Sequence, residues 1–143
     1  MAKGRHLTLE QLDGEVWGEP TFPSYLVTTC HRLRKKPVGE FSVEDLRIMI
    51  GQKIGLEHLL PIAVECLEEV PFARGDFYPG DLLRNVVRCG DEVFDKDPAL
   101  ARRFAAICER AAAQVSVEMD LASKHLRSEM ADDLTVFASR WSQ

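Results

Sequence analysis

Two aspartates in a short aromatic-rich segment are the first candidates for chemistry. Asp76 and Asp81 lie in VPFARGDFYPGD, which also holds three aromatic residues. Paired carboxylates can act as an acid and a base, or bind a divalent cation. No supporting histidine or third carboxylate lies nearby in sequence. We therefore expect Asp81 to cap the helix that follows, where a carboxylate meets free amides, rather than to catalyse a reaction.

The other potentially reactive residues are isolated from one another. Four cysteines lie in or at the ends of predicted helices without CxxC spacing: Cys30, Cys66, Cys89 and Cys108. We expect reduced core thiols rather than a zinc site or disulfides. His31 follows Cys30, but neighbours on a helix point about 100° apart and do not readily form a pair. Because nucleotide-binding and hydrolase motifs are also missing, we expect no enzyme activity, no cofactor and no metal.

Composition predicts one ordinary domain over residues 1–143. The chain is 45% hydrophobic and 29% charged, which is typical of a globular protein. A net charge of -5 and a pI near 5.4 disfavour direct binding of nucleic acid and suit a basic protein partner. No signal peptide or membrane-spanning run is recognisable, so we expect a cytoplasmic location without membrane contact.

The central segment 41–83 should organise the fold through three amphipathic helices. Ser42 and Asp45 form a capping box at the start of the first helix, which should end at the glycines that follow. We expect the second helix to begin near Leu59 or Leu60, because Pro61 is best tolerated in a first turn.

The flanking segments are also expected to be helical. Residues 1–6 should be a flexible tail, and the basic run after His31, up to Lys36, should be a solvated helix end. Asp97 followed by Pro98 is a strong helix start. Apolar spacing from there predicts one long helix, or two broken near residues 116–120, and then a short helix capped by Asp132 or Asp133. Residues 97–143 thus form the C-terminal helices.

The resulting prediction is an all-α fold, a single-domain helical bundle of about six helices with a long C-terminal helix, since no strand pattern is present. Helical spacing predicts nine core residues: Leu46, Met49, Ile50, Leu60, Val64, Leu67, Leu83, Phe104 and Cys108.

Two stretches, EDLRIMIGQKIGLEHLLPIA and GDFYPGDLL, resemble the immunity proteins of bacterial contact-dependent growth inhibition (CDI) systems, and the likeness extends over residues 7–94. Phe94 is followed here by aspartate, where the family often has tryptophan. The resemblance implies a small cytoplasmic inhibitor without activity of its own, which binds one toxin domain delivered by a neighbouring cell. The alternative is a helical regulatory or adaptor module that binds another protein.

If the resemblance holds, the partner is the C-terminal toxin domain of the cognate CDI effector, bound 1:1. Such toxins are frequently nucleases, whose basic surfaces an acidic inhibitor can cover. We expect residues 78–81 to be architectural, so that changing Asp81 costs stability rather than affinity. The candidate toxin-binding residues are the acids of one predicted face and two aromatic anchors: Glu65, Glu68, Glu69, Asp76, Phe77, Tyr78, Asp91, Glu92, Asp95 and Asp97.

Overall fold

The computed structural model describes residues 4–21 and 24–141, and every regular element within these ranges is helical. The all-α prediction with a long C-terminal helix is confirmed, and six of the α-helices have seven residues or more. In chain order, the elements are α1 Leu9–Asp13, α2 Tyr25–Leu33, the 3₁₀ turn η1 Val38–Glu40, α3 Val43–Gly51, α4 Leu56–Glu69, α5 Asp81–Val87, α6 Glu92–Lys96, α7 Pro98–Ala112, α8 Val115–Glu118 and α9 Lys124–Trp141.

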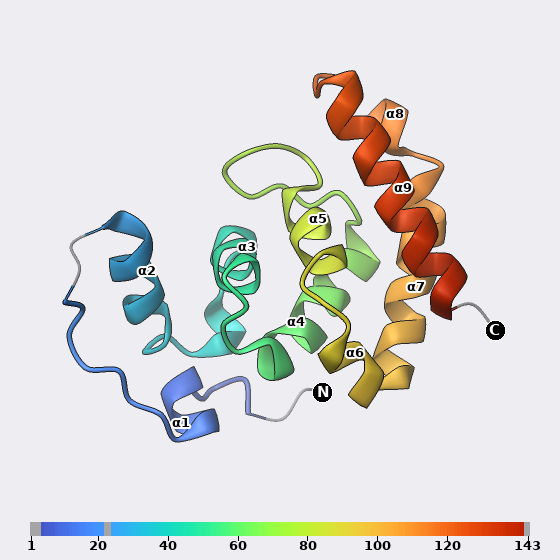
Figure 1. Cartoon of the computed structure of the whole chain (residues 1–143). Coiled ribbons are helices and arrows are strands. Elements are labelled where there is room, and N and C mark those ends of the chain that lie inside the picture. Colours follow the sequence, from blue (N-terminus) through green and yellow to red (C-terminus); the bar gives the residue numbers. More distant parts are fainter. Residues whose placement is uncertain (1–3, 22–23, 142–143) are drawn as a thin grey trace.

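Helices α4 and α5 occupy the middle of the bundle (Figure 1). Helix α3 packs on both of them from one side, while α7 and α9 cover the other side and run next to each other in opposite directions. Helix α2 lies at the edge against α3. No helix in the described ranges is long and apolar enough to cross a membrane.

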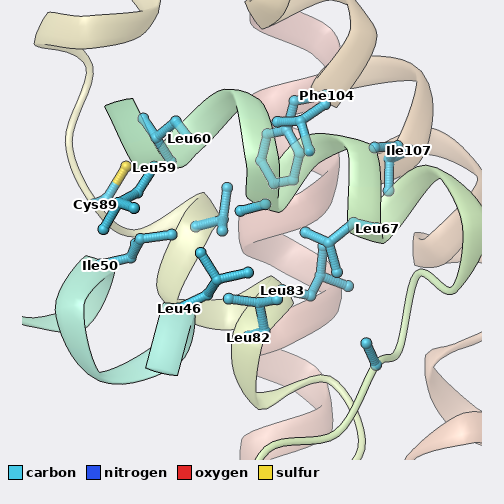
Figure 2. Close-up of a cluster of buried hydrophobic side chains, with 14 of the residues drawn as sticks. Leu46, Ile50, Leu59, Leu60, Leu67, Leu82, Leu83, Cys89, Phe104 and Ile107 are labelled. Carbon is cyan, nitrogen blue, oxygen red and sulfur yellow. The ribbon is translucent and has the colours of Figure 1, made fainter. Parts of the chain in front are cut away.

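The core fills the space between these helices, as the close-up in Figure 2 shows. All nine predicted core residues are buried, which confirms that prediction. An aromatic cluster closes the core where α6, α7 and α9 meet. The Phe94 ring centroid lies 5.6 Å from that of Phe104, and the Phe137 centroid lies 4.9 Å from that of Phe104. Such aromatic pairs contribute beyond the area that they bury.

Two helix starts form as predicted. The Ser42 hydroxyl accepts a hydrogen bond from the Asp45 amide at 3.1 Å, and the Asp45 carboxylate accepts one from the Ser42 amide at 3.1 Å. At α7, the Asp97 carboxylate accepts from the Leu100 amide at 3.2 Å, with Pro98 in the first helical position. Local capping chemistry therefore sets both boundaries.

Helix α4 begins earlier than predicted, at Leu56 rather than near Leu59 or Leu60. Gly55 adopts a left-handed φ of 65°, and its carbonyl accepts hydrogen bonds from the amides of His58 and Leu59. Pro61 therefore lies in the second turn, where it leaves the Glu57 carbonyl without an intrahelical donor. Glu57 lies at the surface, where water can replace that donor.

The described part of the C-terminal region divides into the three helices α7, α8 and α9, where one or two were predicted before the final short helix. The interruptions lie at residues 113–114 and 119–123, and only the second overlaps the predicted break near residues 116–120. The short final helix was wrongly predicted, because α9 continues through Asp132 and Asp133 and neither residue caps a helix. Asp133 instead accepts a hydrogen bond from the Arg88 side chain at 2.7 Å, which links α9 to the end of α5.

The basic run at the end of α2 is not uniformly solvated, so that prediction is wrong for Arg34. Its side chain is 2% exposed, forms an ion pair with Asp13 at 2.8 Å and donates to the Glu15 carbonyl at 2.6 Å. The Arg34 hydrogen bond lowers the pKa of Asp13 below its ordinary value. The Arg34 guanidinium also lies 4.7 Å from the ring centroid of Trp17, which anchors the surface segment before α2.

Part of the expected N-terminal tail is held against the bundle, while residues 1–3 lie outside the described residues. The Arg5 carbonyl accepts a hydrogen bond from the Gly39 amide at 2.8 Å. The Arg5 guanidinium forms two hydrogen bonds, of 3.0 and 2.9 Å, with the Glu65 carboxylate of α4.

The four cysteines carry free thiols. Three are buried and Cys66 is half-buried. Burial raises the pKa of each thiol, and that of Cys89 rises to about 11. At neutral pH these groups are therefore protonated and unreactive, as expected for core thiols.

Replacing a central core leucine should destabilise the fold strongly. Leu60 is fully buried, so Leu60→Ala should lower the free energy of unfolding by about 2–5 kcal/mol, through lost apolar burial and a residual cavity. Urea unfolding followed by circular dichroism measures this. Leu121→Ala is the matched control, because Leu121 is 97% exposed. Equal midpoints for the two variants would contradict the packing described here.

Candidate functional site

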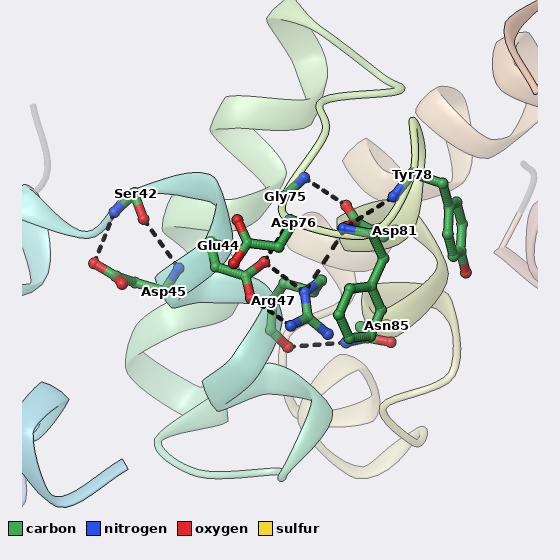
Figure 3. Close-up of polar contacts among 10 residues, drawn as sticks. Ser42, Glu44, Asp45, Arg47, Gly75, Asp76, Tyr78, Asp81 and Asn85 are labelled. Carbon is green, nitrogen blue, oxygen red and sulfur yellow. Dashed lines mark hydrogen bonds and ion pairs between the residues drawn. The ribbon is translucent and has the colours of Figure 1, made fainter. Parts of the chain in front are cut away.

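The loop between α4 and α5 is held in shape by one buried carboxylate. Asp81 is 2% exposed, and its carboxylate accepts hydrogen bonds from the amides of Gly75 at 2.7 Å and Phe77 at 3.0 Å, with Tyr78 at 3.4 Å (Figure 3). Asp81 is the first residue of α5, as expected, but its carboxylate binds loop amides instead of capping the helix, which corrects the predicted contact.

Two glycines allow this loop geometry. A Cβ at Gly75 would lie 2.5 Å from a Glu44 carboxylate oxygen and 3.0 Å from an Asp81 oxygen, so no side chain fits there without movement. Gly80 has φ of 92°, a left-handed conformation that other residues rarely adopt. The GDFYPGD motif thus has an architectural role that depends on both of its glycines.

The loop is also fixed to α3 by an ion pair. Arg47 Nε donates to Glu44 at 2.6 Å, and the Asp76 amide donates to the same Glu44 carboxylate at 2.8 Å. Arg47 lies 3.8 Å from Asp81, and its guanidinium sits 4.0 Å from the Phe77 ring centroid. The hydrogen bond to Arg47 lowers the pKa of Glu44 and raises that of Arg47.

The side chains of Asp76 and Asp81 lie in different environments. The Asp81 carboxylate is occupied by backbone amides, while Asp76 is exposed and has no ion-pair partner among the described residues. Over residues 4–21 and 24–141, no group of three or more histidine, cysteine, aspartate or glutamate side chains is arranged to hold a metal ion.

A groove of ≈ 510 Å³ opens beside this network. It is lined by α2, α3, the loop and α5, including the side chains of Tyr25, Glu44, Arg47 and Phe77. Tyr25 is 75% exposed and Phe77 is 65% exposed. A second hollow of ≈ 260 Å³ lies on the other side of the loop, where Phe77 meets α8 and the turn after it. Phe77 therefore stands between two concave surfaces.

The candidate toxin-binding residues fall into three groups along the chain. Glu65, Glu68 and Glu69 lie on α4; Asp76, Phe77 and Tyr78 lie in the loop; Asp91, Glu92, Asp95 and Asp97 lie at or next to α6. The loop precedes α5 and α6 follows it, so the last two groups lie at opposite ends of α5 (Figure 1). The structure therefore does not bring all of the candidate residues together on one continuous face.

Most of these acids are paired with basic side chains of the same chain. Glu65 binds Arg5, and Glu68 binds Arg103 at 2.7 Å. Arg140, near the end of α9, bridges Asp91 and Asp95. Glu92 lies 3.5 Å from Lys96, and the Asp97 carboxylate caps α7. Asp76 and Glu69 form no ion pair among the described residues, although Asp76 interacts electrostatically with Arg47.

Sequence reasoning missed the contribution of α2 and α3 to the groove. Tyr25 and Leu26 are not among the predicted site residues, and it is the structure that shows both side chains to be exposed. Glu44 and Arg47 are three residues apart on α3, a spacing that predicts an ion pair on a helix surface. Their contact with the loop, 32 residues from Glu44, had no local signal.

Comparison with known protein families gives a match over most of the chain. A family model described as CDI immunity proteins matches residues 11–104, about two thirds of the chain. The matched segment contains α2 to α6, and therefore the loop and the groove. No curated protein and no solved structure matches the chain.

Removing the charge of Asp81 should loosen the loop. Asp81→Asn places an amide group against backbone donors that need an acceptor, so the free energy of unfolding should fall by about 1–3 kcal/mol. Urea unfolding measures the loss. Asp76→Asn, an exposed neighbour without an ion pair, should unfold like the parent; equal losses for both variants would refute the anchoring role of Asp81.

The ion pair between Glu44 and Arg47 should make the free energy of unfolding depend on pH. Because the folded pKa of Glu44 lies below its ordinary value of 4.5, its contribution is complete above pH 4.5 and is lost as pH falls through the lowered folded value. Glu44→Gln lacks this contribution at every pH. The stability gap between parent and variant should therefore be constant from pH 7 to about 5 and shrink by pH 3, in urea unfolding series at each pH. A gap independent of pH would contradict the assignment.

Proposed function

The chain belongs to the CDI immunity proteins, and we propose that it binds the C-terminal toxin domain of its cognate effector 1:1 in the cytoplasm and blocks that domain. The family match carries the immunity role. The proposed mode of action is binding alone, because the buried Asp81 carboxylate of the most distinctive loop is used to hold backbone amides.

We propose further that the toxin is a nuclease. The support is electrostatic: this chain has a net charge of -5, and a nuclease must present a positive surface to the phosphates of its substrate. An acidic inhibitor is attracted to that same surface and can cover the active site within it.

The acidic groups would contribute in two ways. The arginine-paired acids on α4 and at α6 are partly neutralised, so they would act mainly at long range by steering the encounter. The loop group combines the unpaired Asp76 with the exposed ring of Phe77, and would supply close contact. Aromatic residues are enriched at the centre of protein interfaces.

Steering can be tested with the C-terminal toxin domain of the cognate effector. Association measured by surface plasmon resonance should slow steeply as salt rises, while dissociation changes less. The triple variant D91K/E92K/D95K should associate more slowly and protect cells expressing the toxin less well than the parent.

A matched control separates charge from lost ion pairs. Arg140→Ala removes both ion pairs of Arg140 and retains the acids, so it should protect like the parent. These pairs are exposed, and exposed ion pairs contribute little to stability, so the fold should stay intact. Salt-independent association together with full protection by the triple variant would refute electrostatic steering and favour an apolar interface.

A further inference from the structure

We propose that the groove between α2, α3 and the loop binds a basic side chain of the toxin domain, an arginine by preference. This inference rests on the proposed function and specifies its contact chemistry. It adds Tyr25 and Leu26 of α2 to the binding surface, which neither the family match nor the acidic pattern identifies.

The walls of the groove are aromatic and open to solvent. Tyr25 is 75% exposed and has no ring or hydrogen-bond partner within the described part of the chain, and Phe77 is 65% exposed. Large exposed rings around a concave surface are unusual in a chain whose core is otherwise well filled. Aromatic faces attract cations. One face of Phe77 already carries the Arg47 guanidinium at 4.0 Å from the ring centroid, so the exposed ring of Tyr25 is the one open to an incoming cation.

The charged residues that line the groove favour binding of a positively charged side chain. Its charged lining residues are Glu44, Arg47 and Asp76. Glu44 and Arg47 form an ion pair, and Arg47 also interacts electrostatically with Asp76, so the two carboxylates and one guanidinium leave the groove with one net negative charge. A guanidinium can bind a carboxylate through two parallel hydrogen bonds and stack on an aromatic ring at the same time, whereas an ammonium group is a compact point charge. A phosphate or another acidic group would be repelled.

The groove is also held ready for a ligand. Glu44 fixes both Arg47 and the Asp76 amide, and Asp81 fixes the amides on either side of Asp76 (Figure 3). The backbone that presents Asp76 is therefore constrained before binding, which reduces the entropy lost on association.

The test uses this chain and the C-terminal toxin domain of its cognate effector, with dissociation constants measured by calorimetry. Asp76→Asn and Tyr25→Ala should each weaken binding by about tenfold or more, as expected for loss of one partner in a buried charged contact. Tyr25→Phe should bind like the parent because it keeps the ring. Asp132→Asn, which changes an exposed acid on α9 away from the groove, is the matched control and should also leave affinity unchanged. Urea midpoints equal to that of the parent confirm that the variants are folded.

A scan of the toxin domain completes the test. Each arginine and lysine is replaced by methionine in turn, and one replacement should weaken binding to the parent but not weaken binding to Asp76→Asn any further. If the parent binds tightly and Asp76→Asn and Tyr25→Ala bind equally well, the groove assignment is wrong and the proposed function stands. If the parent does not bind the toxin domain at all, the proposed function and this inference both fail.

Discussion

The structure around the candidate site depends on one constraint, the satisfaction of backbone amides by the buried Asp81 carboxylate. A loop without regular secondary structure must find acceptors for its amides, and leaving them unpaired inside a protein is costly. Here a single side chain supplies these acceptors and, as the first residue of α5, ties the loop to a packed helix. The Glu44 carboxylate of α3, which is paired with Arg47, accepts a further hydrogen bond from the Asp76 amide of the loop. The backbone that carries the exposed Phe77 ring is thus constrained by hydrogen bonds to α3 and α5.

The parts of the fold that were predictable from sequence are those governed by near neighbours. Ser42 with Asp45, and Asp97 with Pro98, act within one helical turn, so the residues alone identify both boundaries. The start of α4 was misjudged because Pro61 was assigned to a first turn, whereas Gly55 provides an earlier start. Arg34 was misjudged for a different reason. Its partners Asp13 and Glu15 lie 21 and 19 residues away, and nothing in the basic run itself indicates burial.

The candidate site shows the same division. The loop was recognisable from its unusual density of aromatic residues, glycines and acids, but the groove beside it requires α2 and α3, which tertiary packing alone brings near. Counting acidic residues also overstated the available charge, because Arg5, Arg103 and Arg140 reach across from distant segments to Glu65, Glu68 and the α6 acids. Net charge is a property of composition, whereas the local field depends on which charges the fold pairs.

Which helices contact each other has a consequence for the rate of folding. The most extensive contacts are between α7 and α9 and between α3 and α5, and only one helix separates the members of each pair, so much of the bundle forms between segments that are close along the chain. Proteins rich in such local contacts fold in microseconds to milliseconds, because little loop-closure entropy is lost before the contacts form. The free thiols impose no oxidation step. We therefore expect newly synthesised copies to reach the folded state almost as soon as translation ends, so that the pool of inhibitor is limited by its synthesis rather than by its maturation.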